Sequence, residues 1–126
     1  MAASIAELQK AMTALSESLE RIKQKKDEVD YKINRDACIQ RFEFCFELSW
    51  KISMKVLGIV EPAPKPALRE MARNSLIEDF DLWLSFLDAR NKSSHTYDED
   101  MAKMVLEVSK SFLPEGLNLL KKLSIK

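Results

Sequence analysis

The chain has 126 residues, with 20 Lys and Arg against 20 Asp and Glu, so its formal net charge is zero. This length predicts a single domain over residues 1–126, and the 46% hydrophobic content argues against intrinsic disorder. A net charge of zero argues against sequence-blind attraction to nucleic acid, which needs a basic excess. Two Gly and four Pro are too few for the turns of a strand-rich sandwich or barrel, so the composition favours helices.

The first half of the chain predicts two helices. Ser4 and Glu7 form an S-x-x-E capping box, apolar residues follow at helical spacing, and we expect this helix to end near Val29. A second helix is predicted over residues 34–57, with Gly58 as the left-handed residue that closes it. Because this helix is apolar around most of its circumference, we expect it to be central and partly covered by another chain.

The next stretch predicts a break and then two helices. Residues 61–66 hold three of the four prolines and predict a connector that is not helical in its middle. A short helix is expected over residues 67–73. Ser75 and Glu78 form a second capping box, and the helix that they open should stop between residues 90 and 94.

The last helix is predicted to start at a third capping box, formed by Thr96 and Glu99. Pro114 and Gly116 should kink or restart it. The pattern therefore predicts an all-α fold, an up-and-down four-helix bundle with an extra short helix.

Neither a membrane segment nor a secretory signal is visible. No apolar run approaches the roughly 18 residues that a membrane helix needs, and we expect a cytoplasmic protein without membrane contacts. Cys38 and Cys45 are seven residues apart in a helical pattern, about 10 Å along the axis, which exceeds the Cα separation of a disulfide. We expect both to be buried thiols.

The only His of the chain lies in a polar stretch between the last two predicted helices. Arg90, Asn91, His95 and Tyr97 place a guanidinium, an amide, an imidazole and a phenol within eight residues. A helix that ends at residue 93 or 94 would let Arg90, Asn91 and His95 converge. The guanidinium suits phosphate oxygens, and the imidazole can transfer a proton near neutral pH.

Such a pair could bind a phosphodiester and assist attack by a ribose 2′-hydroxyl without a metal. No metal site and no cofactor are predicted, because one His and two distant Cys cannot build a conventional transition-metal site, and two glycines cannot supply a phosphate loop. The structural alternative is a helix C-terminal cap beside an exposed ring, and spacing alone does not choose between the two.

Two motifs resemble one known family. Residues 90–97, RNKSSHTY, resemble the R-x4-H-x-Y signature of HEPN domain proteins, and residues 40–51, QRFEFCFELSWK, are similar to the second-helix motif of the HEPN subgroup called nucleotidyltransferase substrate-binding proteins. The helical pattern agrees with that family from about residue 4 onwards. The resemblance implies a HEPN-like bundle that forms a homodimer in which two copies of the Arg and His motif face one cleft. It also implies a separately encoded minimal nucleotidyltransferase as partner.

The resemblance also assigns expected roles. Arg90 would hold phosphate, His95 would transfer the proton, Asn91 would orient one of them, and Tyr97 would accept a nucleotide. Related proteins with the fuller signature are ribonuclease toxins, which the partner silences by transferring AMP to the motif tyrosine.

Three charged residues of the second helix are further candidates. Glu43 and Glu47 are one helical turn apart, and Lys51 is one turn further along. Their default role is a solvated or bundle-end ion pair. Because charges on so apolar a helix should have partners, we expect Glu43 or Glu47 to reach Arg90 or Lys51 and to position the site.

The sequence thus leaves three hypotheses open. The first is a substrate-binding subunit that docks a minimal nucleotidyltransferase and offers a nucleotide- or RNA-binding cleft at its homodimer interface. The second is a metal-independent endoribonuclease, the toxin of a toxin-antitoxin pair, that is silenced by AMP transfer to Tyr97. The third is an inert interaction scaffold whose cleft has lost its function.

Overall fold

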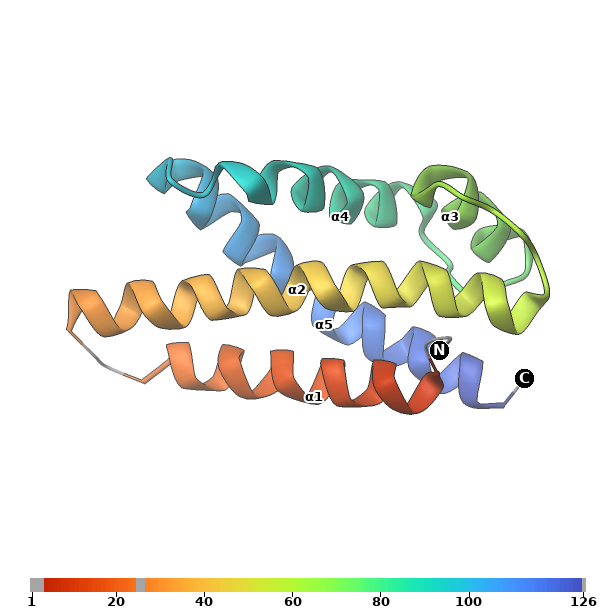
Figure 1. Ribbon diagram of the computed structural model, residues 1–126, viewed down its shortest axis with the longest axis horizontal. Helices are drawn as coiled ribbons and strands as arrows, with labels where there is room; N and C mark the ends of the chain where they lie inside the picture. Colours follow the sequence, from red (N-terminus) through yellow and green to blue (C-terminus); the bar gives the residue numbers. More distant parts are fainter. Residues whose placement is uncertain (1–3, 25–26, 126) are drawn as a thin grey trace.

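The computed structural model describes residues 4–24 and 27–125. Its elements in chain order are α1 (Ile5–Ile22), α2 (Glu28–Leu57), α3 (Pro64–Arg73), α4 (Phe80–Lys92), the short 3₁₀ turn η1 (Ser93–His95) and α5 (Glu99–Ser124). In Figure 1, α2 lies between α1 and α4, and α5 crosses behind it. The predicted all-α, up-and-down bundle with an extra short helix is confirmed, and the described residues contain no strand.

The central position predicted for the second helix is also confirmed. α2 packs against α1, α3, α4 and α5. Gly58 closes it with φ of 69°, a left-handed conformation that residues with a Cβ adopt reluctantly. α2 therefore contributes side chains to every part of the core and to the surroundings of the α4–α5 junction.

Aromatic rings from three helices form the centre of the core. The ring of Phe112 in α5 lies 5.3 Å from those of Phe42 and Phe86, in edge-to-face geometry. Trp83 lies 5.6 Å from Phe112, and Phe46 lies 6.4 Å from both Trp83 and Phe112. Burying these rings against one another fixes α2, α4 and α5 relative to each other.

Both cysteines lie in this core as free, fully buried thiols, as the sequence predicts. Burial raises the pKa of Cys45 to about 12 and also raises that of Cys38. Both thiols are therefore protonated at neutral pH.

The boundary between the first two helices differs from the prediction. α1 does begin after the Ser4 cap, whose hydroxyl accepts a hydrogen bond from Glu7 N at 3.2 Å, but it ends at Ile22 rather than near Val29. α2 begins at Glu28 rather than at residue 34, because the Asp27 carboxylate caps it by accepting from Asp30 N at 2.8 Å. Residues 28 and 29, predicted at the end of the first helix, therefore belong to the first turn of α2.

The proline-rich connector is shorter than predicted. α3 already begins at Pro64, so the expectation that residues 61–66 are non-helical in their middle is wrong from that residue on. The first turn of a helix leaves its N–H groups unpaired, so the missing N–H of proline costs nothing there. Ala67, Leu68 and Met71 are buried against the core.

Two of the predicted capping boxes are also wrong. α4 is capped by Asp79, whose Oδ1 accepts from Leu82 N at 3.0 Å, while Ser75 lies before the helix with φ of 60°. α5 is capped by Asp98, which accepts from the backbone N–H groups of residues 100 and 101, and not by Thr96. In both places an Asp nearer to the helix supplies the oxygen that the hydroxyl was expected to supply.

The last helix runs without a break through Pro114 and Gly116, so of the predicted kink or restart, the restart is wrong. Pro114 lies on the exposed side, where water can bind the carbonyl that loses its partner. Gly116 is buried, and a Cβ there would overlap the end of the Met12 side chain of α1. The glycine thus leaves room for the end of the Met12 side chain against α5. None of the described helices combines the length and apolarity needed to cross a membrane.

Candidate functional site

The junction between α4 and α5 carries the predicted site. α4 ends at Lys92, inside the predicted interval, and η1 follows it. Tyr97 is 84% exposed, and its hydroxyl lies 3.5 Å from Nδ1 of the exposed His95. The two rings meet edge to face, with centroids 6.0 Å apart. The turn thus holds a phenol beside an imidazole in contact with solvent.

Arg90 points from α4 toward α2 and contacts two carboxylates. Its Nη1 lies 3.3 Å from Glu43 Oε2, and its Nε lies 3.3 Å from Glu47 Oε1. The second contact is an ion pair only, because Nε is buried without a hydrogen-bond partner. Glu47 also lies 3.7 Å from Lys51 Nζ. The predicted contacts of Glu43 and Glu47 with Arg90 and Lys51 are therefore present, and the four charges balance.

Ser93 ties the start of η1 to the same carboxylate. Its hydroxyl, 5% exposed as a residue, lies 2.6 Å from Glu43 Oε2 and also 2.6 Å from Arg90 O. Glu43 therefore binds both the last turn of α4 and the first residue of η1 to α2. Ser93 was not predicted, since a serine after a helix carries no distinctive pattern.

A second polar contact holds the other side of the turn. Arg35 of α2 is only 4% exposed and donates from Nη1 to Glu99 Oε2 at 2.7 Å and from Nη2 to Asp36 Oδ1 at 3.2 Å. Burial disfavours the charged form of Arg35, but the hydrogen bonds to Glu99 and Asp36 outweigh it and raise its pKa. The same bond from Arg35 lowers the pKa of Glu99. Lys32 lies 3.8 Å from Glu99 as well.

Arg35 was missed although the sequence holds a signal for it. It lies three, four and seven residues before Cys38, Ile39 and Phe42, all of which are buried, and so it occupies a core position of the helical period. A charged residue in such a register needs a partner from another helix. The sequence does not identify Glu99 as that partner, 64 residues away.

The predicted residues do not all converge within one chain. In the described residues no hydrogen bond or ion pair joins Arg90 to His95. The Asn91 side chain is exposed, and its backbone oxygen accepts from Ser94 Oγ at 3.5 Å. A phosphate that contacted Arg90 would therefore compete with carboxylates that already neutralise it. Over residues 4–24 and 27–125 no group of three or more His, Cys, Asp or Glu is placed to hold a metal ion.

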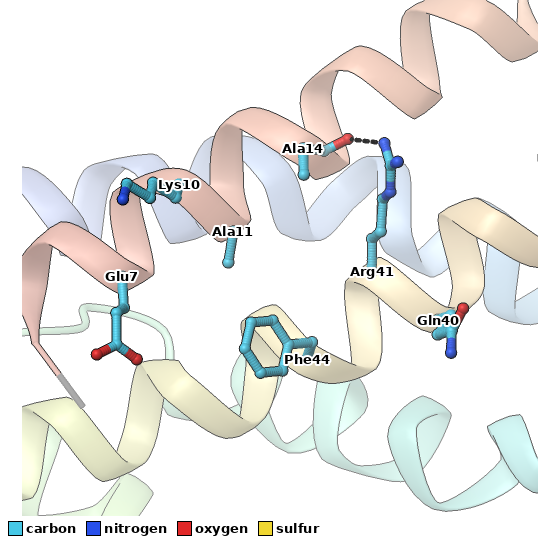
Figure 2. Close-up of a pocket in the computed structure, with 7 residues that line it drawn as sticks. All are labelled: Glu7, Lys10, Ala11, Ala14, Gln40, Arg41 and Phe44. Atoms are coloured by element: carbon cyan, nitrogen blue, oxygen red, sulfur yellow. Dashed lines mark hydrogen bonds between the residues drawn. The ribbon is translucent and has the colours of Figure 1, made fainter. Parts of the chain in front are cut away.

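A separate groove lies between α1 and α2, away from the junction (Figure 2). It has a volume of about 530 Å³, and Phe44, which is 56% exposed, projects into it opposite Ala11. Arg41 crosses the groove and donates to Ala14 O at 2.7 Å. This groove is largely apolar. Gln40, Arg41 and Phe44 of the second-helix motif line it, whereas no residue of the R-x4-H-x-Y motif does.

Comparison with known proteins gives consistent results. Residues 3–125 match the family described as nucleotidyltransferase substrate binding protein like. Over 93 residues the chain is 39% identical to a Haemophilus influenzae protein named probable ribonuclease HepT, a match that covers 68% of this chain and 64% of that protein. The chain thus spans less than two thirds of the length of this curated relative.

Solved structures show the same fold. One from Haemophilus influenzae, described as revealing the fold of a substrate binding domain of a nucleotidyltransferase, superposes with a TM-score of 0.86 and 28% identity, covering 96% of this chain and 99% of that one. A protein from Thermus thermophilus superposes with a TM-score of 0.79 and 28% identity, covering 92% and 98% of the two chains. With the family match over almost the whole chain, these findings show that this protein belongs to the nucleotidyltransferase substrate-binding family of HEPN-like helical proteins.

Proposed function

We propose that this protein is the substrate-binding subunit of a two-component nucleotidyltransferase. In this proposal it pairs with a separately encoded minimal nucleotidyltransferase, forms a homodimer, and offers a nucleotide or RNA a cleft at the homodimer interface. The observation that carries the proposal is Tyr97, a large aromatic residue that is 84% exposed yet has its hydroxyl 3.5 Å from the imidazole of His95. A phenol so exposed contributes little to folding and is accessible to the active site of another protein.

Tyr97 suits the role of nucleotide acceptor. In the proposed step its oxygen attacks the α-phosphorus of ATP held by the partner, the bond to the bridging oxygen of the β-phosphate breaks, and pyrophosphate leaves. The phenolic proton passes to Nδ1 of His95, which lies 3.5 Å from the phenol oxygen. Asp98, Glu99 and Asp100 follow Tyr97 directly, so a free polyanion would be repelled here, whereas phosphates neutralised inside the partner would not.

The homodimer is supported by an uncovered face of α2. Val29, Ile33 and Phe44 are 68%, 62% and 56% exposed. At 3.6 residues per turn they lie within roughly 60° of one another around the helix, together with Gln40. Scattered exposed apolar residues need no explanation, but a stripe of this kind is typical of a helix that packs against another chain. Glu43, the partner of Arg90, borders this stripe, so pairing through it would bring two Arg90 networks close together.

Modification of Tyr97 is the central test. The protein is incubated with the purified minimal nucleotidyltransferase, Mg²⁺ and ATP, and the adduct is located by mass spectrometry. We expect one AMP on Tyr97, no adduct on Tyr97→Phe, and slower transfer to His95→Ala. Tyr31→Phe, which removes the other tyrosine of the chain, is the matched control and should be modified like the wild type. If an active partner leaves Tyr97 unmodified, its role as acceptor is wrong.

The dimer has a test of its own. Phe44→Glu places a charge in the exposed stripe and should give a monomer in light scattering at micromolar concentration, where the wild type should be a dimer. Val60→Glu is the control, because Val60 is 97% exposed but lies beyond the end of α2. A wild-type monomer would contradict the proposed interface.

A metal-independent endoribonuclease is the second candidate. It is favoured by the exposed imidazole of His95, which could take the proton of a ribose 2′-hydroxyl, and by the relative named probable ribonuclease. Arg90 would then have to leave one of its carboxylates to bind the scissile phosphate. Incubation of the pure protein with RNA in the presence of EDTA, beside a His95→Ala control, tests this activity. If neither RNA cleavage nor transfer occurs and both site variants are silent, the scaffold hypothesis remains.

A further inference from the structure

The segment from His95 to Tyr97 has few contacts of its own. His95 and Tyr97 are both exposed, and neither packs into the core. Within the turn, the backbone N–H of Asp98 donates to His95 O at 3.1 Å. The orientation of the Tyr97 phenol therefore depends on how firmly the chain is held before and after it.

Both ends of this turn are fastened to α2. Before the turn, Glu43 binds Ser93, as described above. After the turn, Glu99 is the first residue of α5 and accepts the hydrogen bond from buried Arg35. The two anchors are eight residues apart on α2, about 12 Å along its axis, which is a span that a rigid helix keeps constant. Only Asp98 separates Tyr97 from the anchored residue.

We propose that Arg35 is a positioning residue for Tyr97: by binding Glu99 it fixes the first turn of α5 and thereby the direction in which the phenol is presented. The inference rests on the proposed function of Tyr97 as acceptor. Arg35 acts through Glu99 and touches neither Tyr97 nor a nucleotide.

The chemistry of the contact explains why arginine occupies this place. Its planar fork reaches two carboxylates at once, because Nη1 donates to Glu99 while Nε and Nη2 lie 3.3 Å and 3.2 Å from Asp36 Oδ1. A lysine presents one nitrogen and would reach both only poorly. Burying a guanidinium is an inefficient way to gain stability, since an apolar side chain of similar volume packs as well. A fixed direction is what the ion pair supplies and an apolar contact does not.

Transfer of AMP from ATP to the protein by the minimal nucleotidyltransferase gives the first readout. Arg35→Gln and Glu99→Gln should each lower the transfer rate at saturating acceptor by roughly tenfold to a hundredfold, the range that misplacement of a reacting group produces. The KM for ATP should be unchanged, because the partner binds ATP. The double variant should lose no more than either single one, since both act along one path. Arg35→Lys should retain more of the rate than Arg35→Gln.

Arg41→Gln is the control for these variants. Arg41 also links α2 to another helix, but it donates to Ala14 O, on the α1 side.

A spectroscopic readout does not depend on transfer. His95 is the only His, so its imidazole protons give one resolved set of NMR lines. The cross-peaks between the rings of His95 and Tyr97, whose centroids are 6.0 Å apart, should weaken in Glu99→Gln and in Arg35→Gln but not in Arg41→Gln. Glu99→Gln is the decisive variant should Arg35→Gln unfold, because the Glu99 side chain is 52% exposed.

The outcomes separate the two proposals. If wild-type protein accepts no AMP while the cross-peaks weaken as described, the acceptor role fails and the positioning by Arg35 stands. If Glu99→Gln is modified at the wild-type rate with the cross-peaks intact, or if the two single losses add, the positioning role of Arg35 is wrong.

Discussion

The aromatic core and the α4–α5 junction are built in opposite ways. In the core, each ring touches several others, and Phe112 alone has four aromatic neighbours. At the junction, single polar contacts between side chains hold the turn, and the residues proposed to act are exposed. The core therefore fixes where the helices lie, and the junction fixes where a few atoms point. Substitutions in the two regions should separate stability from activity.

Truncation at the centre of the core should have the largest effect on stability. Phe112→Ala removes a fully buried ring and leaves a cavity, and we expect the free energy of unfolding to fall by about 3–5 kcal/mol. Urea unfolding followed by circular dichroism measures this loss. Phe44→Ala is the matched control, because the same side chain is half-exposed there and its removal should cost far less. Equal losses would contradict the assigned core.

Substitution of Glu43, the carboxylate of α2 that binds the α4–α5 junction, should have an intermediate effect on stability. Glu43→Gln weakens the contacts with Arg90 and Ser93. We expect a loss of about 1–2 kcal/mol, toward the lower end for hydrogen bonds to a charged group because the Glu43 side chain is partly exposed. Glu70→Gln weakens an ion pair within α3 to Arg73, whose side chain is 71% exposed, and should change stability little. A Glu43→Gln variant as stable as the Glu70→Gln control would show that the junction is not held in this way.

Acidification should remove the contribution of the Arg35–Glu99 contact to stability, which is smaller than the two effects above. The pKa of Glu99 is lower in the folded chain than its ordinary value of 4.5. At pH values between the lowered pKa and 4.5, the unfolded chain therefore binds more protons than the folded chain. The stabilisation is complete above about pH 4.5 and is lost as the pH falls through the lowered value. The stability difference between wild type and Glu99→Gln, measured by thermal unfolding, should therefore shrink below about pH 4.5 and stay constant from pH 5 to 7. A difference that grows on acidification would contradict the direction of the shift.

Substitution of His95 should have the smallest effect on stability. Its ring is exposed and meets that of Tyr97 edge to face, so His95→Ala should shift the free energy of unfolding by less than about 0.5 kcal/mol. The same variant should lose most transfer to Tyr97. Calorimetry and mass spectrometry on one preparation measure both, and a strongly destabilised His95→Ala would place the residue with the core instead.

Much of the fold followed from the hydrophobic period. The period located the central helix, and Gly58 marked its end as a residue that readily adopts a left-handed conformation. The proline connector at residues 61–66 and the polar stretch at residues 90–97 separated the later helices. Helix starts were predicted less well, because hydroxyl capping boxes and Asp caps compete locally. Asp27, Asp79 and Asp98 each took the cap, and only the contacts of the folded chain decide between such neighbours.

The parts of the site that were predictable are those whose residues lie near one another along the chain. Arg90, His95 and Tyr97 fall within one stretch, and a helical turn relates Glu43 to Glu47. The contact between Arg35 and Glu99 spans 64 residues, and periodicity cannot supply such a pairing because it depends on how two helices cross. The sequence also suggested that Arg90 could meet His95, whereas Arg90 turns to the carboxylates of α2, whose negative charge attracts it more than a neighbouring ring does.

The two buried thiols have a practical consequence. A thiol that stays protonated and shielded from solvent reacts slowly with oxidants and alkylating reagents, so neither cysteine of the folded chain responds readily to the redox state of its surroundings. Cys38 and Cys45 become reactive only when the helices that cover them separate. The rate at which a thiol reagent labels them therefore measures how often the helical bundle opens, without any added probe.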